Sequence, residues 1–365
     1  MRCIHCQHDA KYRERSDGHC PKCRRRFAFE PQRGDPMTDG VFSSAIERVS
    51  SHGSVRFHVD HLYYEVRRRH RRTFNRAILA TAGVIGFVTM IVAAIVGTRA
   101  LVYVLLAALT VFGLCLWTSE SLRDRRRLRR ALFDTLLRRF TAVHGVPAGL
   151  IERKQRGEQR TAERDASLDE MLAYSFDRAV ICDRAETVDL LLANQFHFEN
   201  NCAVLAVDGY PPRAFETVRS MLRNNPRLIV VALHDASEAG CKLAHRLRND
   251  PAWFKDLVPV VDMGLRPAHR KSFPGLEDAR TPRRRVPASE GISQQEAGWL
   301  AHSALALAVV VPEQIIKRLF RGISVVEERQ GDSGSGGSDG SGGSDGSGSF
   351  DIEADLSDAG SDSFG

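Results

Sequence analysis

Two long apolar runs stand out along the chain, at residues 77–96 and 100–117, and neither contains a charged residue. A helix needs about 20 apolar residues to cross the hydrocarbon core of a bilayer, and each run has roughly that length. Only Gly97, Thr98 and Arg99 separate them. The pattern therefore predicts two transmembrane helices that form a tight hairpin over 77–118.

Basic residues flank this predicted hairpin on both sides, as "RRRHRR" (67–72) before it and "RDRRRLRR" (123–130) after it. Lys and Arg favour the cytoplasmic side of a membrane, so we expect both termini in the cytoplasm. This predicts a multi-pass protein of the bacterial cytoplasmic (inner) membrane. The alternative is a buried hairpin in a soluble protein. The basic clusters are expected to contact anionic lipid headgroups, with nucleic-acid contact as the alternative role.

Four shorter apolar runs, at 179–183, 202–208, 228–235 and 257–263, alternate with segments of helical pattern. Strands alternating with helices predict an α/β domain with a parallel sheet, which we place at 167–329. Each run ends at or near an acid, namely Asp183, Asp208, Asp235 or Asp262. We expect these acids along one edge of the sheet, where α/β proteins usually bind ligands. An apolar helix over 292–322, interrupted by Pro312, should pack on the sheet.

The remaining segments divide by composition. Residues 37–76 read as helix, short strand and helix, a small helical module for which a winged-helix-like arrangement is one interpretation. Residues 119–166 read as a basic juxtamembrane helix and a linker.

Residues 330–365 are rich in Gly, Ser and Asp and predict a disordered acidic tail. Four apolar residues are interspersed among its acids: Phe350, Ile352, Leu356 and Phe364. It is either a docking segment for a protein partner or a basic groove of this chain, or a solubilising tail.

The first 30 residues carry Cys3, Cys6, Cys20 and Cys23 as two C-x2-C pairs with a thirteen-residue spacer. Each pair can present two thiolates to one ion, and two pairs complete a tetrahedral Zn²⁺ shell. Four sulfur ligands close the site, so we expect structural Zn²⁺ in a ribbon over 1–30. The ribbon resembles the zinc ribbons that open many bacterial proteins. A disulfide framework is the alternative, and a reducing cytoplasm disfavours it.

The distribution of charge along the chain indicates which kind of partner the protein favours. The formal net charge is +7, but eight acids and no Lys or Arg lie between residues 331 and 365. The rest of the chain is therefore strongly basic. A basic surface favours phosphate-rich partners such as nucleic acid or anionic lipid.

The stretch 207–247 followed by "DMGLRP" (262–267) resembles the Toprim domain of type IIB topoisomerase A subunits and their meiotic relatives. A Gly-x-Pro turn stands at 209–211, Asp235 follows the third strand, Gly240 opens the next helix and Gly264 begins the last segment. The resemblance covers about 178–267 and implies a Toprim-like or Rossmann-like parallel sheet.

The resemblance also implies a possible Mg²⁺ cofactor. In the family a Glu after the first strand and paired acids after the third hold Mg²⁺ on a phosphodiester. Here Asp183 stands at the Glu position, Asp235 matches the first acid of the pair, and Ser237 replaces the second, with Glu238 beside it. The acidic motif is thus degenerate, and Asp235 and Ser237 could instead cap a helix. "HLYYEV" (61–66) is similar to the family's tyrosine motif, but we interpret Tyr63 and Tyr64 as packing residues.

Taken together, these patterns predict a membrane-anchored, cytoplasmic-facing binding or scaffold protein. It would have a structural zinc ribbon and a degenerate Toprim-like domain, and nucleic acid would be its favoured ligand. The alternative hypothesis is a Mg²⁺-dependent nuclease or another phosphoryl-transfer enzyme that uses Asp183, Asp235 and Glu238.

Overall fold

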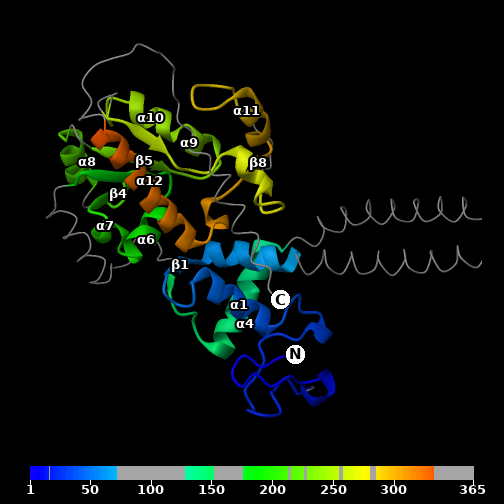
Figure 1. The fold of residues 1–365 in the computed structure, drawn as a ribbon. Coiled ribbons are helices and arrows are strands. Elements are labelled where there is room, and N and C mark those ends of the chain that lie inside the picture. Colours follow the sequence, from blue (N-terminus) through cyan, green and yellow to red (C-terminus); the bar gives the residue numbers. More distant parts are fainter. Residues whose placement is uncertain are drawn as a thin grey trace, which may run out of the picture. The chain divides into compact units, whose positions relative to one another are not determined.

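The structure is a computed structural model (Figure 1). It describes residues 1–15, 17–71, 128–151, 176–212, 215–225, 228–254, 258–279 and 285–332. Its contacts divide the chain into two compact units. Unit 1 comprises 1–47 and 62–147, and unit 2 comprises 48–61 and 148–365. The chain therefore enters unit 2 briefly, at residues 48–61, before the α/β domain begins.

The predicted transmembrane hairpin is not supported. Within the described ranges, no helix is both long and apolar enough to cross a bilayer. Helix α12 (Pro312–Asp332) has the length, but its exposed face carries charged residues such as Lys317 and Arg321. This finding corrects the transmembrane part of the predicted fold class, the membrane as a partner, and the inner-membrane location. The runs 77–96 and 100–117, and the acidic tail from residue 333 onward, lie outside the described residues.

Unit 1 is built around an aromatic core. Helix α1 (Asp39–Val49) and helix α4 (Arg130–His144) place apolar side chains at positions i, i+3 and i+7, so each buries one face. Residues 59–71 are also helical. The buried rings lie 4.6–6.3 Å apart between centroids. They belong to Phe29, Phe42, Tyr63, Phe133 and Phe140.

Tyr63 and Tyr64 are both buried, and the hydroxyl of Tyr63 donates to the carbonyl of Leu128 at 3.1 Å. This agrees with the interpretation that they are packing residues. The helix-strand-helix order predicted for 37–76 is observed as α1, β1 (Phe57–His58) and helix 59–71. Strand β1 pairs in parallel with β2 (Leu150–Ile151), and both strands belong to unit 2.

The predicted parallel sheet is present in unit 2. It comprises β3 (Arg178–Cys182), β4 (Cys202–Ala206), β5 (Ile229–Leu233) and β6 (Val260–Asp262), in the order β4-β3-β5-β6. All three pairings are parallel. Nearly every strand residue is buried, as expected for a parallel sheet covered on both faces. Chain order reverses between β3 and β5, which makes their carboxyl ends a topological switch point.

Helices cover the sheet (Figure 1). Helices α8 (Phe215–Arg223) and α10 (Leu243–Asn249) share one apolar core with alternate residues of the strands, and Trp253 and Phe254 complete it. Helices α6 (Ala185–Ala193) and α12 contact strands β3 and β5 respectively. The other elements of unit 2 are short: α7 (Phe196–Glu199), α9 (Glu238–Cys241), η3 (Pro267–Lys271), β7 (Asp278–Ala279), α11 (Gln294–Leu300), β8 (Ser303–Ala304) and η4 (Leu307–Val309).

The expected single apolar helix over 292–322 is wrong. Helix α11 ends at Leu300, and residues 301–311 form a short strand, a 3-10 turn and extended chain. Pro312 does not interrupt a helix but begins α12, where its missing N–H costs nothing because first-turn donors have no intrahelical partner. This extended segment proves important at the acidic edge of the sheet.

Candidate functional site

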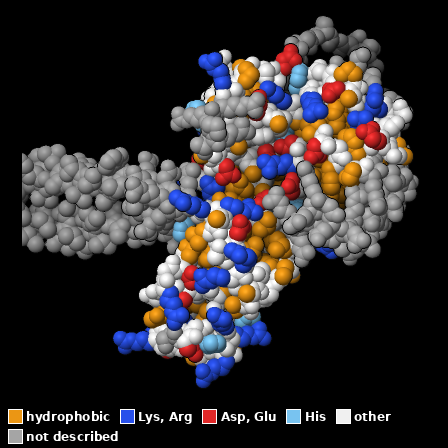
Figure 2. Space-filling view, turned by 180° about the vertical axis from the view of Figure 1, so that it is seen from behind, with side chains coloured by type: hydrophobic (Ala, Val, Ile, Leu, Met, Phe, Trp, Pro, Cys, Tyr) orange, Lys and Arg blue, Asp and Glu red, His pale blue; other side chains and the backbone are white. Residues whose placement is uncertain are grey.

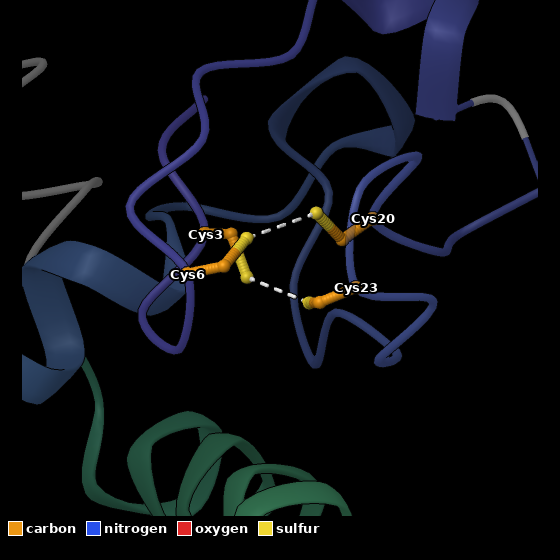
Figure 3. Close-up of side chains that lie close together, drawn as sticks. All are labelled: Cys3, Cys6, Cys20 and Cys23. Carbon is orange, nitrogen blue, oxygen red and sulfur yellow. Dashed lines mark hydrogen bonds between the residues drawn. The ribbon is translucent and has the colours of Figure 1, made fainter.

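The four predicted cysteines converge (Figure 3). All four sulfur atoms lie within 4.8 Å of one another. Cys3 and Cys23 are 3.7 Å apart between sulfurs, and Cys6 and Cys20 are 3.6 Å apart. A tetrahedral zinc ion with Zn–S bonds of about 2.3 Å separates its sulfurs by about 3.8 Å. The group could therefore hold a metal ion such as zinc.

The two cysteine pairs lie in turns with the same backbone hydrogen bonds. In the first turn, Gln7 N–H donates to the Cys3 carbonyl at 3.0 Å, and in the second, Arg24 N–H donates to the Cys20 carbonyl at 2.9 Å. Gln7 and Arg24 both have a positive φ, 59° and 60°. A short antiparallel bridge closes each turn, one at residues 2 and 9 and the other at 19 and 26. The repeated geometry follows from the repeated C-x2-C spacing.

The thiol environments favour a cation. Burial raises the pKa of Cys20, but the backbone N–H groups of Cys23 and Lys22 outweigh it and lower the pKa to about 7. The backbone N–H of Arg25 lowers the pKa of Cys23, yet desolvation and the neighbouring thiols raise it to about 11. Four thiols so close together cannot all ionise unless a positive charge joins them, and a metal ion supplies that charge.

A hydrogen-bond chain fixes the ribbon within unit 1. Arg25 Nη1 lies 2.8 Å from His5 Nδ1, His5 Nε2 lies 3.2 Å from His144 Nδ1, and His144 Nε2 lies 2.7 Å from a carboxylate oxygen of Asp39. Arginine can only donate and the carboxylate can only accept, so both imidazoles are neutral and donate in the same direction. Desolvation and then Arg25 lower the pKa of His5, in agreement. His5 is therefore engaged away from the four sulfurs.

Asp183 and Asp235 also meet, at the switch point between β3 and β5. The backbone N–H of Asp235 donates to Asp183 Oδ2 at 3.0 Å. Asp183 Oδ1 is buried and has no hydrogen-bond partner. Burial, followed by the charge of Asp235, raises the pKa of Asp183 to about 7. Asp183 is thus a carboxyl group that retains its proton close to neutral pH.

Both carboxylate oxygens of Asp235 contact donor groups of this chain. Its Oδ1 accepts the backbone N–H of Leu307 at 2.6 Å, and its Oδ2 forms an ion pair with Arg184 Nε at 2.6 Å. Burial raises the pKa of Asp235, and Arg184 opposes that change. Ala236 and Leu305 exchange two backbone hydrogen bonds of 2.8 and 3.1 Å. The extended segment before α12 therefore occupies the edge where a ligand would be expected.

Glu238, the third predicted acid, does not join the pair. Its carboxylate forms an ion pair with Lys242 at 3.1 Å. Ser237 caps α9, since its Oγ accepts the N–H of Gly240 at 3.0 Å, as the capping alternative predicted for this serine. Across the described residues, the four cysteines are the only group of three or more His, Cys, Asp or Glu side chains within reach of one ion. The structure thus gives no support to a Mg²⁺ site.

The sequence reasoning missed a buried histidine at this edge. His234 is completely buried, with Nδ1 2.8 Å from the Asp235 carbonyl and Nε2 2.9 Å from Asp262 Oδ1. Both partners are acceptors, so both nitrogens donate and the ring is an imidazolium. Burial lowers the pKa of His234, but Asp262 raises it above its ordinary value. Arg266 Nε donates to Asp262 Oδ2 at 3.1 Å and completes the network.

This histidine explains two glycines that carry the Toprim resemblance. A Cβ at Gly264 would overlap the His234 ring, and a Cβ at Gly240 would overlap the Asp235 carbonyl and crowd His234 Nδ1. Gly264 therefore makes room for the His234 ring, and Gly240 makes room mainly for the Asp235 backbone carbonyl. The one signal in the sequence was the "HD" pair that ends the third apolar run, together with Asp262 at the end of the fourth.

Comparisons with models of protein families, with curated proteins and with solved structures find no match. The resemblance to the Toprim domain therefore stays a prediction that rests on the residues named above.

Proposed function

We propose that the chain is a non-enzymatic binding protein whose ribbon, held by a structural zinc ion, contacts the phosphates of nucleic acid. The four-cysteine group is the observation that carries the proposal. Four sulfur ligands leave no open coordination position, so the ion would support structure and not chemistry. In this proposal the α/β domain is a Toprim-like fold that lacks a catalytic metal.

The charge of the ribbon supports a phosphate-rich ligand. Residues 1–30 contain eight Lys or Arg and four Asp or Glu. One of the basic residues, Arg15, is buried against Glu30. The others are exposed: Arg2, Lys11, Arg13, Lys22, Arg24, Arg25 and Arg26. Figure 2 shows Lys and Arg side chains projecting around this end of unit 1. Such a surface attracts the nucleic-acid backbone without reading its sequence.

The acidic edge supports binding over phosphoryl transfer. A nuclease would need carboxylates that are free to hold Mg²⁺ with water in the remaining positions. Here Asp235 accepts from Leu307 and pairs with Arg184, while Glu238 pairs with Lys242. Two of the three acids that the alternative hypothesis requires, Asp235 and Glu238, are therefore already engaged.

The test is the salt dependence of binding to a short labelled DNA duplex, measured by fluorescence anisotropy on the zinc-loaded chain. Each phosphate contact contributes about −0.9 to the slope of log K against log salt concentration. Arg24→Gln with Arg26→Gln removes two exposed charges and spares Arg25, which contacts His5. The slope should become about two units shallower.

Lys317→Gln with Arg321→Gln provides the matched control, because it removes two charges from α12 in the other unit. Its slope should equal that of the unchanged chain. An unchanged slope in the ribbon variant, or an equal change in the control, would contradict the assignment to the ribbon. Absence of salt-dependent binding to duplex and to single strands alike would remove the proposed function.

A further inference from the structure

The spacer between the two cysteine pairs carries an exposed aromatic side chain, Tyr12. Among the residues of unit 1 that the structure describes, it is the one exposed Phe, Tyr or Trp, with an exposed fraction of 39 %. The other described Phe and Tyr rings of this unit are buried. Lys11 and Arg13, both exposed, lie on either side of Tyr12 in the sequence. The ribbon surface thus presents an aromatic ring between two cations.

The ribbon's own groups fix the turn that carries Tyr12. The ring belongs to the first residue of a short 3-10 helix, η1 (Tyr12–Arg15). The last residue of this helix, Arg15, is buried, forms an ion pair with Glu30 and donates from Nε to the Ala10 carbonyl at 3.2 Å. The Arg15 guanidinium lies 5.6 Å from the centroid of the Tyr12 ring. Attraction between the ring and this fixed cation orients the exposed tyrosine.

The one acid of η1 takes part in closing the turn. The carboxylate of Glu14 accepts the backbone N–H of Lys11 at 2.9 Å, and the backbone N–H of Glu14 donates to the Lys11 carbonyl at 3.1 Å. Residues 11–15 contain three Lys or Arg and this single acid, so their formal net charge is +2. The turn therefore remains attractive to a phosphate group.

An oriented, exposed ring beside cations matches the way in which proteins bind unpaired bases. A base can stack on an aromatic side chain whatever its identity, because every base has a π face, while cations contact the backbone. The inference rests on the proposed contact between the ribbon and nucleic acid. We propose that Tyr12 stacks on an unpaired base, so that the ribbon binds single-stranded nucleic acid through its bases as well as its phosphates.

The two contributions can be measured separately. Phosphate contacts release counterions and determine the slope of log K against log salt concentration. Stacking of a base on Tyr12 releases no counterion, so it should change the affinity for a single strand and leave that slope as it is. In a duplex the bases are already paired and stacked on one another, so Tyr12 should contribute little there.

The experiment uses the zinc-loaded full-length chain with a labelled oligothymidylate and with an abasic strand of the same length, which has the same phosphates but no bases. Fluorescence anisotropy gives the affinity for each strand at one salt concentration. The unchanged chain should bind the oligothymidylate about five- to a hundredfold more tightly than the abasic strand. Tyr12→Leu should bind both strands alike, at the abasic level. Tyr12→Phe retains the ring and should keep the preference.

Two controls separate stacking from a loss of structure. The zinc content of Tyr12→Leu, measured by mass spectrometry, should equal that of the unchanged chain, as should its salt slope on duplex DNA. Phe198→Leu is the matched variant, because Phe198 is an exposed aromatic residue of α7 in the other unit. It should keep the preference for the strand that has bases.

Equal affinities of the unchanged chain for the oligothymidylate and the abasic strand would overturn the role of Tyr12 and leave the phosphate contacts of the proposed function in place. The same conclusion would follow if Tyr12→Leu kept the preference, or if it weakened duplex and single-strand binding by the same factor. Absence of salt-dependent binding to duplex, oligothymidylate and abasic strand alike would instead remove the proposed function, and the role of Tyr12 with it.

Discussion

The ribbon and the acidic edge of the sheet differ in the partners available to the side chains that could ligate a metal ion. In the ribbon, four thiols converge within reach of one ion, and a metal cation would complete the arrangement. At the sheet edge, Asp235 accepts a backbone N–H and pairs with an arginine. A carboxylate that already pairs with groups of its own protein, as Asp235 does, is therefore a weak indication of a metal site. Four substitutions test this contrast, from the largest expected effect to the smallest.

Cys20→Ser should abolish stoichiometric zinc binding and unfold the ribbon. Structural zinc contributes about 10–16 kcal/mol in small zinc domains, and one missing thiolate removes most of it. Metal content measured by mass spectrometry and the dispersion of ribbon NMR signals would check this. His19→Ala, beside the same cysteine, is the control and should keep the metal. Full zinc content in Cys20→Ser would show that the four sulfurs are not the ligands.

Asp183→Asn should remove a pH-dependent loss of stability from unit 2. Asp183 has an ordinary pKa of 3.8 when unfolded and about 7 when folded. The folded state binds the extra proton between those values, so the free energy of unfolding falls as pH rises from about 4 to 7. The loss amounts to roughly 4 kcal/mol over the window. Urea titrations at several pH values, followed by Trp253 fluorescence, should show a flatter profile in the variant.

The control for this profile is Asp208→Asn, because Asp208 is exposed and follows β4 at the same end of the sheet. It should retain the pH dependence of the unchanged chain. A profile of Asp183→Asn that runs parallel to that of the unchanged chain would contradict a buried, protonated Asp183.

Gly264→Ala should destabilise unit 2 by about 1–3 kcal/mol, because the added methyl group overlaps the His234 ring and forces the network to shift. Gly298→Ala is the matched control. No atom lies within 4 Å of its Cβ position, and it stands in α11, where alanine favours the helix. Urea unfolding should therefore show opposite signs for the two variants. Equal effects would show that His234 does not set the requirement for glycine.

Ser237→Ala should cost about 1 kcal/mol, the usual value of a lost helix N-cap. The effect should be independent of Mg²⁺, since Ser237 bonds to Gly240 and not to a metal. Ser293→Ala, which removes the N-cap of α11, is the comparison and should cost a similar amount. Stabilisation of the unchanged chain by Mg²⁺ that Ser237→Ala abolishes would restore the catalytic interpretation of this edge.

Sequence reasoning succeeded where geometry depends on neighbouring residues. The C-x2-C spacing determines where two thiols lie within one turn. A single contact between the two turns then brings all four thiols together. The alternating runs likewise predicted all four strands of the parallel sheet.

Sequence reasoning failed where contacts between distant segments decide the structure. That Leu307 would bind Asp235 depends on a contact across 72 positions, and the apolar composition of 299–311 suggested a helix instead. The membrane hairpin was inferred from apolar length and the flanking basic residues, and none of the described helices supports it.

Residues 48–61 have a consequence for the order of folding during synthesis. This segment belongs to the α/β unit, and Ser51 donates a hydrogen bond to Glu313, 262 positions later. At about 5–20 residues per second, the ribosome adds Glu313 roughly 13–50 seconds after Ser51. Phe57 likewise precedes its partner on β2, Leu150, by many positions. The earliest part of this domain must therefore wait, exposed or chaperoned, until the last helix has been made.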